Sequence, residues 1–267
     1  MEYLILVCIG IVMGLFGGLL GLGGSVVMIP ALVLAFGENQ HLYQASAMIC
    51  NFFVAGAAVI VHKKAEVLVA DIIKWLVPSA ASGIILGVAI SNSSAFAGEK
   101  SYLLARVFGL FMIYVIIYNC TMFGKSRGGA SGFDLSKARR SVPLTILCGL
   151  LTGIPAGLLG IGGGTTCVPA QQLFLKMPLK RAISNSAATI AAIALIGAFY
   201  KNITLPQHGT TIVQSLKIAG VAIPGAIFGA FLGGRSMHKL SADAVRVVFI
   251  LLAAVACYKL LTVAPAP

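Results

Sequence analysis

Charged side chains are scarce in this sequence, and their scarcity excludes most soluble folds. Only 10% of the 267 residues are Asp, Glu, Lys or Arg, whereas 59% are hydrophobic and the mean hydropathy is +1.00. A soluble domain usually carries about a quarter charged residues. Apolar runs of about 20 residues, the length that crosses a bilayer core, recur along the whole chain. We therefore predict an all-α, polytopic integral membrane protein.

Acidic residues are missing from the middle of these apolar runs. The seven carboxylates all fall in loops or at segment ends: Glu2, Glu38, Glu66, Asp71, Glu99, Asp134 and Asp243. Proton and sodium relays usually place an acid within a membrane span. An anion that leaves a negative-inside cell gains about 2.3 kcal/mol per charge for each 100 mV. The sequence therefore favours transport driven by the membrane potential, and it leaves the direction open.

Catalytic and metal-binding clusters are also missing. The six cysteines contain no C-x-x-C pair, so neither a disulfide framework nor a zinc site is indicated. Four histidines, His41, His62, His208 and His238, lie in or near predicted loops without an i, i+4 pair, and we expect them to be solvated. An enzyme would need such a cluster within the apolar segments. We predict no metal, no cofactor and no enzymatic activity.

The excess of basic residues indicates membrane orientation rather than nucleic-acid binding. The chain has 19 Lys and Arg against 7 acidic residues, but the basic residues lie between the apolar runs or at their ends. Five of them fall in residues 124–141, a Gly- and Ser-rich segment typical of a solvated linker. This linker divides the chain into a first membrane repeat, 1–123, and a second, 142–267. We expect no cleaved signal peptide, because the N-terminus lacks a basic region and an A-x-A site.

The two halves share an aligned sequence. Residues 14–31 (GLFGGLLGLGGSVVMIPA) and 153–170 (GIPAGLLGIGGGTTCVPA) have 9 identities in 18 positions without a gap. They lie within apolar segments 4–36 and 142–175, which are too long for one crossing. The other apolar segments are 42–61, 75–90, 102–123, 182–200, 212–232 and 244–263. Each half is therefore predicted to be one copy of a single repeat.

The distribution of charge predicts how the repeats are oriented. If segments 4–36 and 142–175 each enter the membrane and return, 14 Lys and Arg lie on the linker side and 5 on the other side. If both segments cross the membrane, 11 Lys and Arg lie on the linker side and 8 on the other side. The positive-inside rule favours the first arrangement. We therefore predict two inverted-topology repeats, each starting with a broken or re-entrant helical segment, with the linker cytoplasmic and both termini outside.

A glycine cluster is the predicted turning point of each returning segment. Non-helical backbone at membrane depth must face protein or an internal cavity. The short helix after each cluster begins with unpaired N–H groups and a positive dipole end, and we expect Ser25 and Thr165 or Thr166 as N-caps. Two such ends that converge would bind an anion without any lysine. The candidate residues are Gly23, Gly24, Ser25, Gly162, Gly163, Gly164, Thr165 and Thr166.

Glycine can also serve only to let helices approach closely, and this is the alternative role of the two clusters. The motifs Gly83-x-x-x-Gly87 and Gly225-x-x-x-Gly229 occupy equivalent positions in the halves and are expected to have that packing role. Neither cluster continues to a Lys-Ser/Thr pair or to a third glycine of G-x-G-x-x-G, so nucleotide binding is not supported.

The paired G-L-G-G and G-I-G-G-G segments, each followed by a proline within a hydrophobic half, resemble the TauE/SafE sulfite exporter family, also called the 4-toluene sulfonate uptake permeases. The resemblance covers nearly the whole chain. It implies transport of sulfite, sulfonates or related small organic anions across the bacterial inner membrane. The family tends to carry a polar segment after each short helix, and residues 182–186 (AISNS) are a relative of it whereas 45–49 (ASAMI) depart from it. Asn185 and Ser186 are therefore the preferred donors to the anion, and Asn51 is a weaker candidate.

Arg106 and Arg246 occupy equivalent positions in the two halves and complete the candidate site, although snorkelling to the interface is as common a role for such residues. We predict export of sulfite or an organosulfonate through a central site between the repeats. The alternatives are an importer of a sulfonate or another organic anion, a membrane-embedded enzyme, and a scaffold. The expected partners are the anion and membrane lipid, and the sequence leaves open whether two chains form a homodimer.

Overall fold

The computed structural model describes residues 1–20, 23–64, 68–96, 98–121, 141–236 and 242–263, and these ranges contain helices and turns but no strand. The side chains of 20, 61–64, 99, 180, 236 and 242–246 are outside the description, as is the predicted linker apart from Ser141. The first half contains α1 (Glu2–Leu20), α2 (Ser25–Phe36), α3 (Gln40–Lys64), α4 (Ala70–Ser91), the 3-10 turn η1 (Gly98–Lys100) and α5 (Ser101–Thr121). The second half contains α6 (Val142–Leu159), α7 (Gly164–Phe174), α8 (Leu179–Thr204), the 3-10 turn η4 (Leu205–His208), α9 (Ile212–Ser236) and α10 (Ala242–Leu261).

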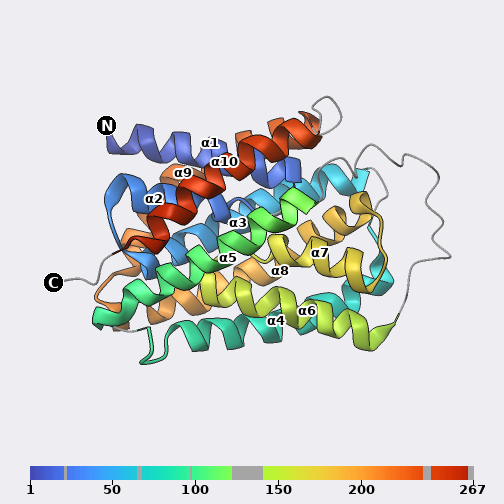
Figure 1. Ribbon diagram of the computed structural model, residues 1–267, viewed down its shortest axis with the longest axis horizontal. Helices are drawn as coiled ribbons and strands as arrows, with labels where there is room; N and C mark the ends of the chain where they lie inside the picture. The colour runs from blue at the N-terminus through green and yellow to red at the C-terminus, as the bar shows by residue number, and fades with distance from the viewer. Residues whose placement is uncertain (21–22, 65–67, 97, 122–140, 237–241, 264–267) are drawn as a thin grey trace.

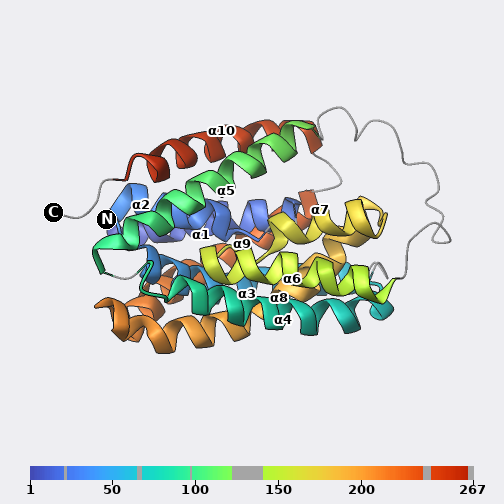
Figure 2. The ribbon, with the colours of Figure 1, turned by 60° about the horizontal axis from the view of Figure 1, so that its bottom comes forward.

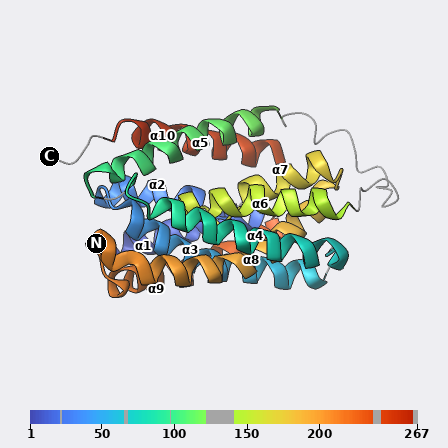
Figure 3. The same cartoon turned by 90° about the horizontal axis from the view of Figure 1, so that it is seen from below.

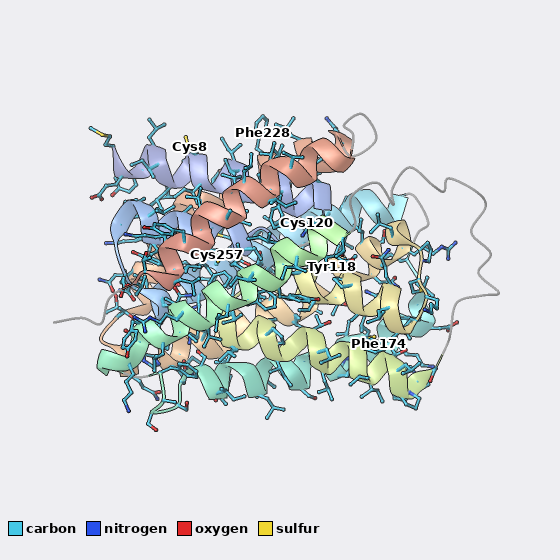
Figure 4. All side chains as sticks on the ribbon, viewed as in Figure 1. Cys8, Tyr118, Cys120, Phe174, Phe228 and Cys257 are labelled. Atoms are coloured by element: carbon cyan, nitrogen blue, oxygen red, sulfur yellow. The ribbon has the colours of Figure 1, made fainter. Side chains whose placement is uncertain are left out.

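Most of these helices have the length and composition of membrane spans. Within the described ranges, seven helices are long and apolar enough to cross a bilayer, namely α1, α3, α4, α5, α6, α8 and α9. Their outward faces are apolar, and Figure 4 shows Phe228 of α9 and Cys8 of α1 on the exterior. The prediction of an all-α, polytopic membrane protein is confirmed.

Each half begins with a long helix followed by a short one that turns back. α2 has 12 residues and α7 has 11, so at about 1.5 Å per residue each covers roughly half of a bilayer core. Gly24, before α2, lies against Met13 in the middle of α1. Gly163, before α7, lies against Thr152 in the middle of α6. Both loops therefore fold back to mid-depth, as the glycine clusters predict.

The two halves run in opposite directions through the bundle. Figure 1 shows the N-terminus and the final turns of α10 at one end, which we call the terminal end. The last turn of α5 and the first turn of α6 lie at the opposite end, which we call the linker end. Because the first half runs from the terminal to the linker end and the second half runs back, the predicted inverted arrangement of the repeats is confirmed.

The main helix pairs each join a helix of one half to a helix of the other. α1 packs along α9 and α6 packs along α4, while α3 crosses α8 near the centre and α5 lies beside α10 along one edge (Figures 2 and 3). Glycines bring the first two pairs together: a Cβ on Gly87 would lie 2.2 Å from the Ile154 carbonyl oxygen, and one on Gly229 would lie 2.2 Å from that of Ile11. The expected packing role of these glycines is confirmed.

The outer pair, α5 and α10, is also tied to the inner helices. Cys257 Sγ of α10 lies 3.4 Å from the Gly109 carbonyl oxygen of α5. The Tyr118 hydroxyl of α5 donates to Gln172 Oε1 of α7 at 2.9 Å, and Figure 4 shows Tyr118 between these helices. α10 in turn packs on α2. The outer pair thus covers both half-length helices.

Candidate functional site

The first glycine loop ends on a helix without a side-chain cap of its own. Gly23 has a φ of 74°, a left-handed conformation that favours glycine. Gly24 is the N-cap of α2, and Ser25 is the first helical residue, so the expectation that Ser25 is the N-cap is wrong. Ser25 is fully buried. Its backbone N–H therefore needs a partner from elsewhere in the fold.

Asn51 of α3 supplies that partner. Its Oδ1 accepts a hydrogen bond from the Ser25 backbone N at 3.3 Å, and its Nδ2 donates to Ser25 Oγ at 2.8 Å. Asn51 is fully buried in the middle of α3. The side chain of another helix thus performs the role that a capping serine usually has.

The second loop has three left-handed glycines. Gly160, Gly162 and Gly163 have φ values of 75°, 71° and 85°. Gly160 is the C-cap of α6 and Gly163 is the N-cap of α7. The expectation that Thr165 or Thr166 caps α7 is therefore wrong. Left-handed backbone at three positions requires residues without a Cβ, which explains why this cluster is richer in glycine than close packing needs.

The two loops lie against each other, and Asn51 lies between them. A Cβ on Gly23 would lie 3.1 Å from the Ile161 carbonyl oxygen in the second loop, so the loops meet directly. A Cβ on Gly162 would lie 2.5 Å from Asn51 Nδ2. The same amide that holds Ser25 of α2 therefore contacts the loop before α7. The N-terminal ends of the two half-length helices converge at this point, as predicted.

Thr165 is the one unsatisfied side chain at the start of α7 in the described structure. It is 2% exposed, and its Oγ1 has no hydrogen-bond partner there. The neighbouring Thr166 bonds its hydroxyl to the Gly163 carbonyl oxygen at 3.0 Å. A buried hydroxyl without a partner costs about 1–3 kcal/mol. A hydroxyl of this kind beside free helix N–H groups is suited to donate to a ligand oxygen.

Sequence comparison identifies the family to which this arrangement belongs. The family model for the sulfite exporter TauE/SafE matches residues 6–260. The chain belongs to the TauE/SafE family. No solved structure matches it.

Several curated relatives are named as membrane transporters. The chain is 27% identical to the "Probable membrane transporter protein MamO" of Paramagnetospirillum magneticum, covering 96% of this chain and 44% of the relative. It is 25% identical to the "Probable membrane transporter protein YunE" of Bacillus subtilis (94% of this chain, 96% of the relative) and to MJ0441 of Methanocaldococcus jannaschii (91% and 90%). The chain thus spans less than half the length of the MamO relatives and nearly the whole length of YunE and MJ0441.

The polar segment that resembles the TauE/SafE pattern lies to one side of the loops. Asn185 Oδ1 accepts from the backbone N of Val69, the N-cap residue of α4, at 3.0 Å, and its Nδ2 donates to Gln171 Oε1 at 3.2 Å. α8 touches Gly23 through Ile190, five residues further on, which is about 7 Å along the helix. The Ser186 side chain contacts Cys167 of α7. Asn185 and Ser186 thus join α4, α7 and α8, and Asn51 lies at the junction of the loops.

Arg106, one of the two predicted arginines, does not lie at the loops. Arg106 is exposed at the terminal end, where it donates to the Val263 carbonyl oxygen at 3.4 Å and lies 4.7 Å from the centre of the Tyr102 ring. The Arg246 side chain is outside the described residues. The loops themselves contain no Lys or Arg, so backbone N–H groups, Asn51 and Thr165 are the described donors.

Gln44 also lies at the site, although it was not among the residues predicted from the sequence. Gln44 is fully buried, donates from Nε2 to the Leu158 carbonyl oxygen at 3.2 Å, and has an Oε1 without a partner in the described structure. A Cβ on Gly160 would meet its side chain. Gln44 and Asn51 are seven residues apart and so share one face of α3. Two amide side chains at that spacing in an otherwise apolar helix are the sequence signal that points to Gln44 as a site residue.

For His41, the structure corrects the expectation that the histidines are solvated. His41 is 4% exposed, and its ring stacks on that of His208 with centroids 3.6 Å apart. His62 and His238 are outside the described side chains. No group of three or more His, Cys, Asp or Glu in the described chain is placed to hold a metal ion.

Proposed function

We propose that this TauE/SafE protein transports a small oxoanion, sulfite or an organosulfonate, which binds where the two glycine loops meet. The observation that carries the proposal is the convergence of the α2 and α7 N-termini on Asn51 beside the unpaired Thr165 hydroxyl. Helix N-termini present N–H groups and about half a positive charge to an anion. The family match and the transporter names of the relatives support transport, and the choice of anion rests on the family.

The absence of basic residues from the loops suits a transport site. Each helix end favours an anion by about 0.3–1 kcal/mol at an exposed site and by up to about 2 kcal/mol when it is partly buried. A site built from dipoles and hydroxyls binds an oxoanion without the tight ion pair that Lys or Arg would form. Release into either aqueous phase is then possible on the timescale of transport.

The buried state of the loops suggests how access alternates. Gly23, Gly24 and residues 160–165 are all buried, so these parts of the loops have little contact with solvent in the described conformation. In inverted-repeat transporters, one repeat moves against the other around a fixed central site. We propose that α3 and α8, which cross at the centre, separate the loops alternately from the terminal and the linker end.

Direction follows from the membrane potential. With the linker in the cytoplasm of a bacterial inner membrane, an anion that moves from the linker end to the terminal end gains about 2.3 kcal/mol per charge for each 100 mV. The acidic residues with described side chains, Glu2, Glu38 and Asp71, lie at helix ends or in a loop, away from the glycine loops. Potential-driven export therefore needs no additional ion. Import of a sulfonate or another organic anion is the alternative within the same site.

Counterflow of labelled sulfite in proteoliposomes tests the proposal. Purified wild-type protein should exchange sulfite, and sulfate, thiosulfate or taurine should compete to different degrees that identify the substrate. An inside-negative potential should accelerate efflux. A purified, folded protein that neither binds nor exchanges any of these anions would favour a scaffold.

A further inference from the structure

A second polar site lies at the terminal end, far along the bundle from the glycine loops. A cavity of about 430 Å³ opens there between the starts of α3 and α5 and the turn η4, and we call it the terminal pocket. Its lining includes Glu38, Gln40, His41, Ser101 and His208. This volume is within the range of about 300–1,000 Å³ that is typical of small-molecule sites.

Two helix N-termini point at the terminal pocket. Asn39 and Gln40 at the start of α3 line it, as do Gly98 and Ser101 at the start of α5. Both helices are long enough, at 25 and 21 residues, to carry a full helix dipole. These two helix ends therefore favour an anion in the pocket, and the Glu38 carboxylate in the lining opposes it when ionised.

Gln40 gives independent evidence that the pocket is suited to a ligand. Its side chain is 5% exposed and lines the pocket, yet neither Nε2 nor Oε1 has a hydrogen-bond partner among the described residues. His208 Nδ1, also in the lining, is likewise buried and unpartnered there, and it can accept a hydrogen bond from ordered water because Nε2 holds the ring proton. Unpaired buried polar atoms are costly, so groups of this kind usually face a ligand or ordered water.

The protons on the two histidines can be assigned from their partners. Lys201 Nζ donates to His41 Nδ1 at 2.8 Å, so His41 carries its proton on Nε2 and donates it to the Phe96 carbonyl oxygen at 3.1 Å. Asn92 Oδ1 accepts from Lys201 Nζ at 3.0 Å and from His208 Nε2 at 3.2 Å. The stacked rings thus stand between the Lys201 ammonium and the cavity.

Lys201, when it is protonated, brings a positive charge that has no acidic partner among the described residues. It is 0% exposed, its three protons go to His41, Asn92 and the Ser91 hydroxyl, and all three partners are neutral. The C-terminal ends of α4 and α8 offset part of this charge through their dipoles. A buried charge is costly unless it is compensated, and an anion in the adjoining cavity would supply the rest.

We propose that the terminal pocket binds a small organic oxoanion. Its oxygens would lie against the N-termini of α3 and α5 and the Gln40 amide, and its short tail against Val33, Ala105 and Val263 in the lining. The pocket is larger than a sulfite ion needs, which favours an anion with an organic tail. This inference stands apart from transport through the glycine loops, because it requires only binding.

Cysteine protection tests the proposal at the pocket itself. Gln207 is exposed and lines the cavity, whereas Thr211 is exposed and outside the lining. In a background carrying Cys8→Ser and Cys120→Ser, the Gln207→Cys and Thr211→Cys proteins are reacted with a methanethiosulfonate reagent. Saturating methanesulfonate should slow labelling of the Gln207→Cys protein by about tenfold and leave the Thr211→Cys protein unchanged. Tetramethylammonium chloride at equal ionic strength should protect neither.

Charge reversal in the pocket provides the second arm. Adding Gln40→Glu to the Gln207→Cys protein keeps the side chain's size and places a carboxylate where the anion should bind, so protection should disappear. Lys217→Met, which removes an exposed lysine near the start of α9, is the matched control and should leave protection intact. Equal labelling rates with and without methanesulfonate, or undiminished protection in the Gln40→Glu protein, would overturn the proposal whether or not the protein transports sulfite.

Discussion

Asn51 and Ser25 are joined by two hydrogen bonds, one from the Ser25 backbone N to Asn51 Oδ1 and one from Asn51 Nδ2 to Ser25 Oγ. They lie 26 residues apart in sequence, in the middle of α3 and the first turn of α2. The Asn51 amide also contacts Gly162 of the second loop. One side chain therefore fixes the positions of both half-length helices, and a change in it should alter anion binding.

Replacing Asn51 with Asp should strongly reduce sulfite exchange while the protein still inserts and folds. The carboxylate has nearly the same shape and can accept the Ser25 N–H, but it places a negative charge where the anion binds. We expect a loss of at least about tenfold in exchange per inserted molecule, equivalent to about 1.4 kcal/mol.

Asn119→Asp is the matched control, because Asn119 is buried in α5 and its Nδ2 donates to Val115 O within its own helix. If both variants lost exchange equally, buried charge itself would be responsible. Wild-type exchange by the Asn51→Asp protein would place the anion elsewhere.

Thr165→Val separates ligand binding from stability. The substitution preserves shape and removes a hydroxyl that has no partner among the described residues, so thermal stability should be unchanged or higher. The affinity for sulfite should fall by about fivefold to tenfold, which corresponds to the net free energy of about one hydrogen bond. Isothermal titration calorimetry and a melting curve on the same preparation provide both values.

Thr189→Val gives the opposite pattern, since the Thr189 hydroxyl donates to the Asn185 carbonyl oxygen at 2.8 Å and lies within α8. It should change stability slightly and leave sulfite affinity unaffected. Equal affinities for the Thr165→Val and wild-type proteins would remove Thr165 from the site.

Gly87→Ala should destabilise the fold, whereas Gly56→Ala should not. The added Cβ at Gly87 would lie 2.2 Å from the Ile154 carbonyl oxygen, so α4 and α6 must move apart. Overpacking of this kind costs about 1–3 kcal/mol. Nothing lies within 4 Å of a Cβ at Gly56 in α3, where alanine should stabilise the helix by about 0.5–1 kcal/mol. Unfolding in a detergent titration checks both, and similar midpoints would contradict the packing role.

The features that repeat in the sequence were predictable from it. The 14–31 and 153–170 match located both returning segments, and the distribution of lysine and arginine indicated their inversion. Glycine carries this information because left-handed backbone at Gly23 and Gly162 excludes nearly every other residue. Local backbone requirements of this kind can be inferred from residue type alone.

Contacts between distant helices could not be predicted in the same way. Asn185 was preferred over Asn51 because it lies in a family-like polar segment, but its amide bonds Val69 and Gln171. Lys201 and His41 are 160 residues apart and meet only because the end of α8 lies beside the start of α3. Such pairs depend on how the helices cross, and the spacing of residues along one helix does not predict the crossing.

Opposite ends of the bundle should be accessible from opposite sides of the membrane. Lys217 is exposed near the start of α9, at the terminal end, whereas Lys74 and Lys176 are exposed at the linker end. In a background without Cys8 and Cys120, an impermeant thiol reagent added to intact cells should label Lys217→Cys protein. Lys74→Cys and Lys176→Cys proteins should react only after permeabilisation. The reverse pattern would place the linker outside and overturn the assignment from charge.

Anion binding in the terminal pocket should strengthen as the pH falls. Burial raises the pKa of the Glu38 carboxyl above its ordinary value, and the nearby Lys259 lowers it by a smaller amount. Below this raised pKa, Glu38 is protonated and no longer repels an anion; above it, the carboxylate weakens both binding and the folded state. His41 and His208 in the lining, and Arg106 beside Val263, also face this region, and protonation of the histidines would act in the same direction.

Glu38→Gln isolates the contribution of the carboxyl. Methanesulfonate is the appropriate probe, because its charge is constant between pH 5 and pH 8 whereas that of sulfite is not. Wild-type affinity, measured by protection of the Gln207→Cys protein, should rise as the pH is lowered from 8 toward the raised pKa of Glu38. The Glu38→Gln protein should bind more tightly at pH 8 and show a shallower dependence on pH, with any remaining slope due to the histidines. Identical pH profiles for the two proteins would show that Glu38 does not act on the pocket.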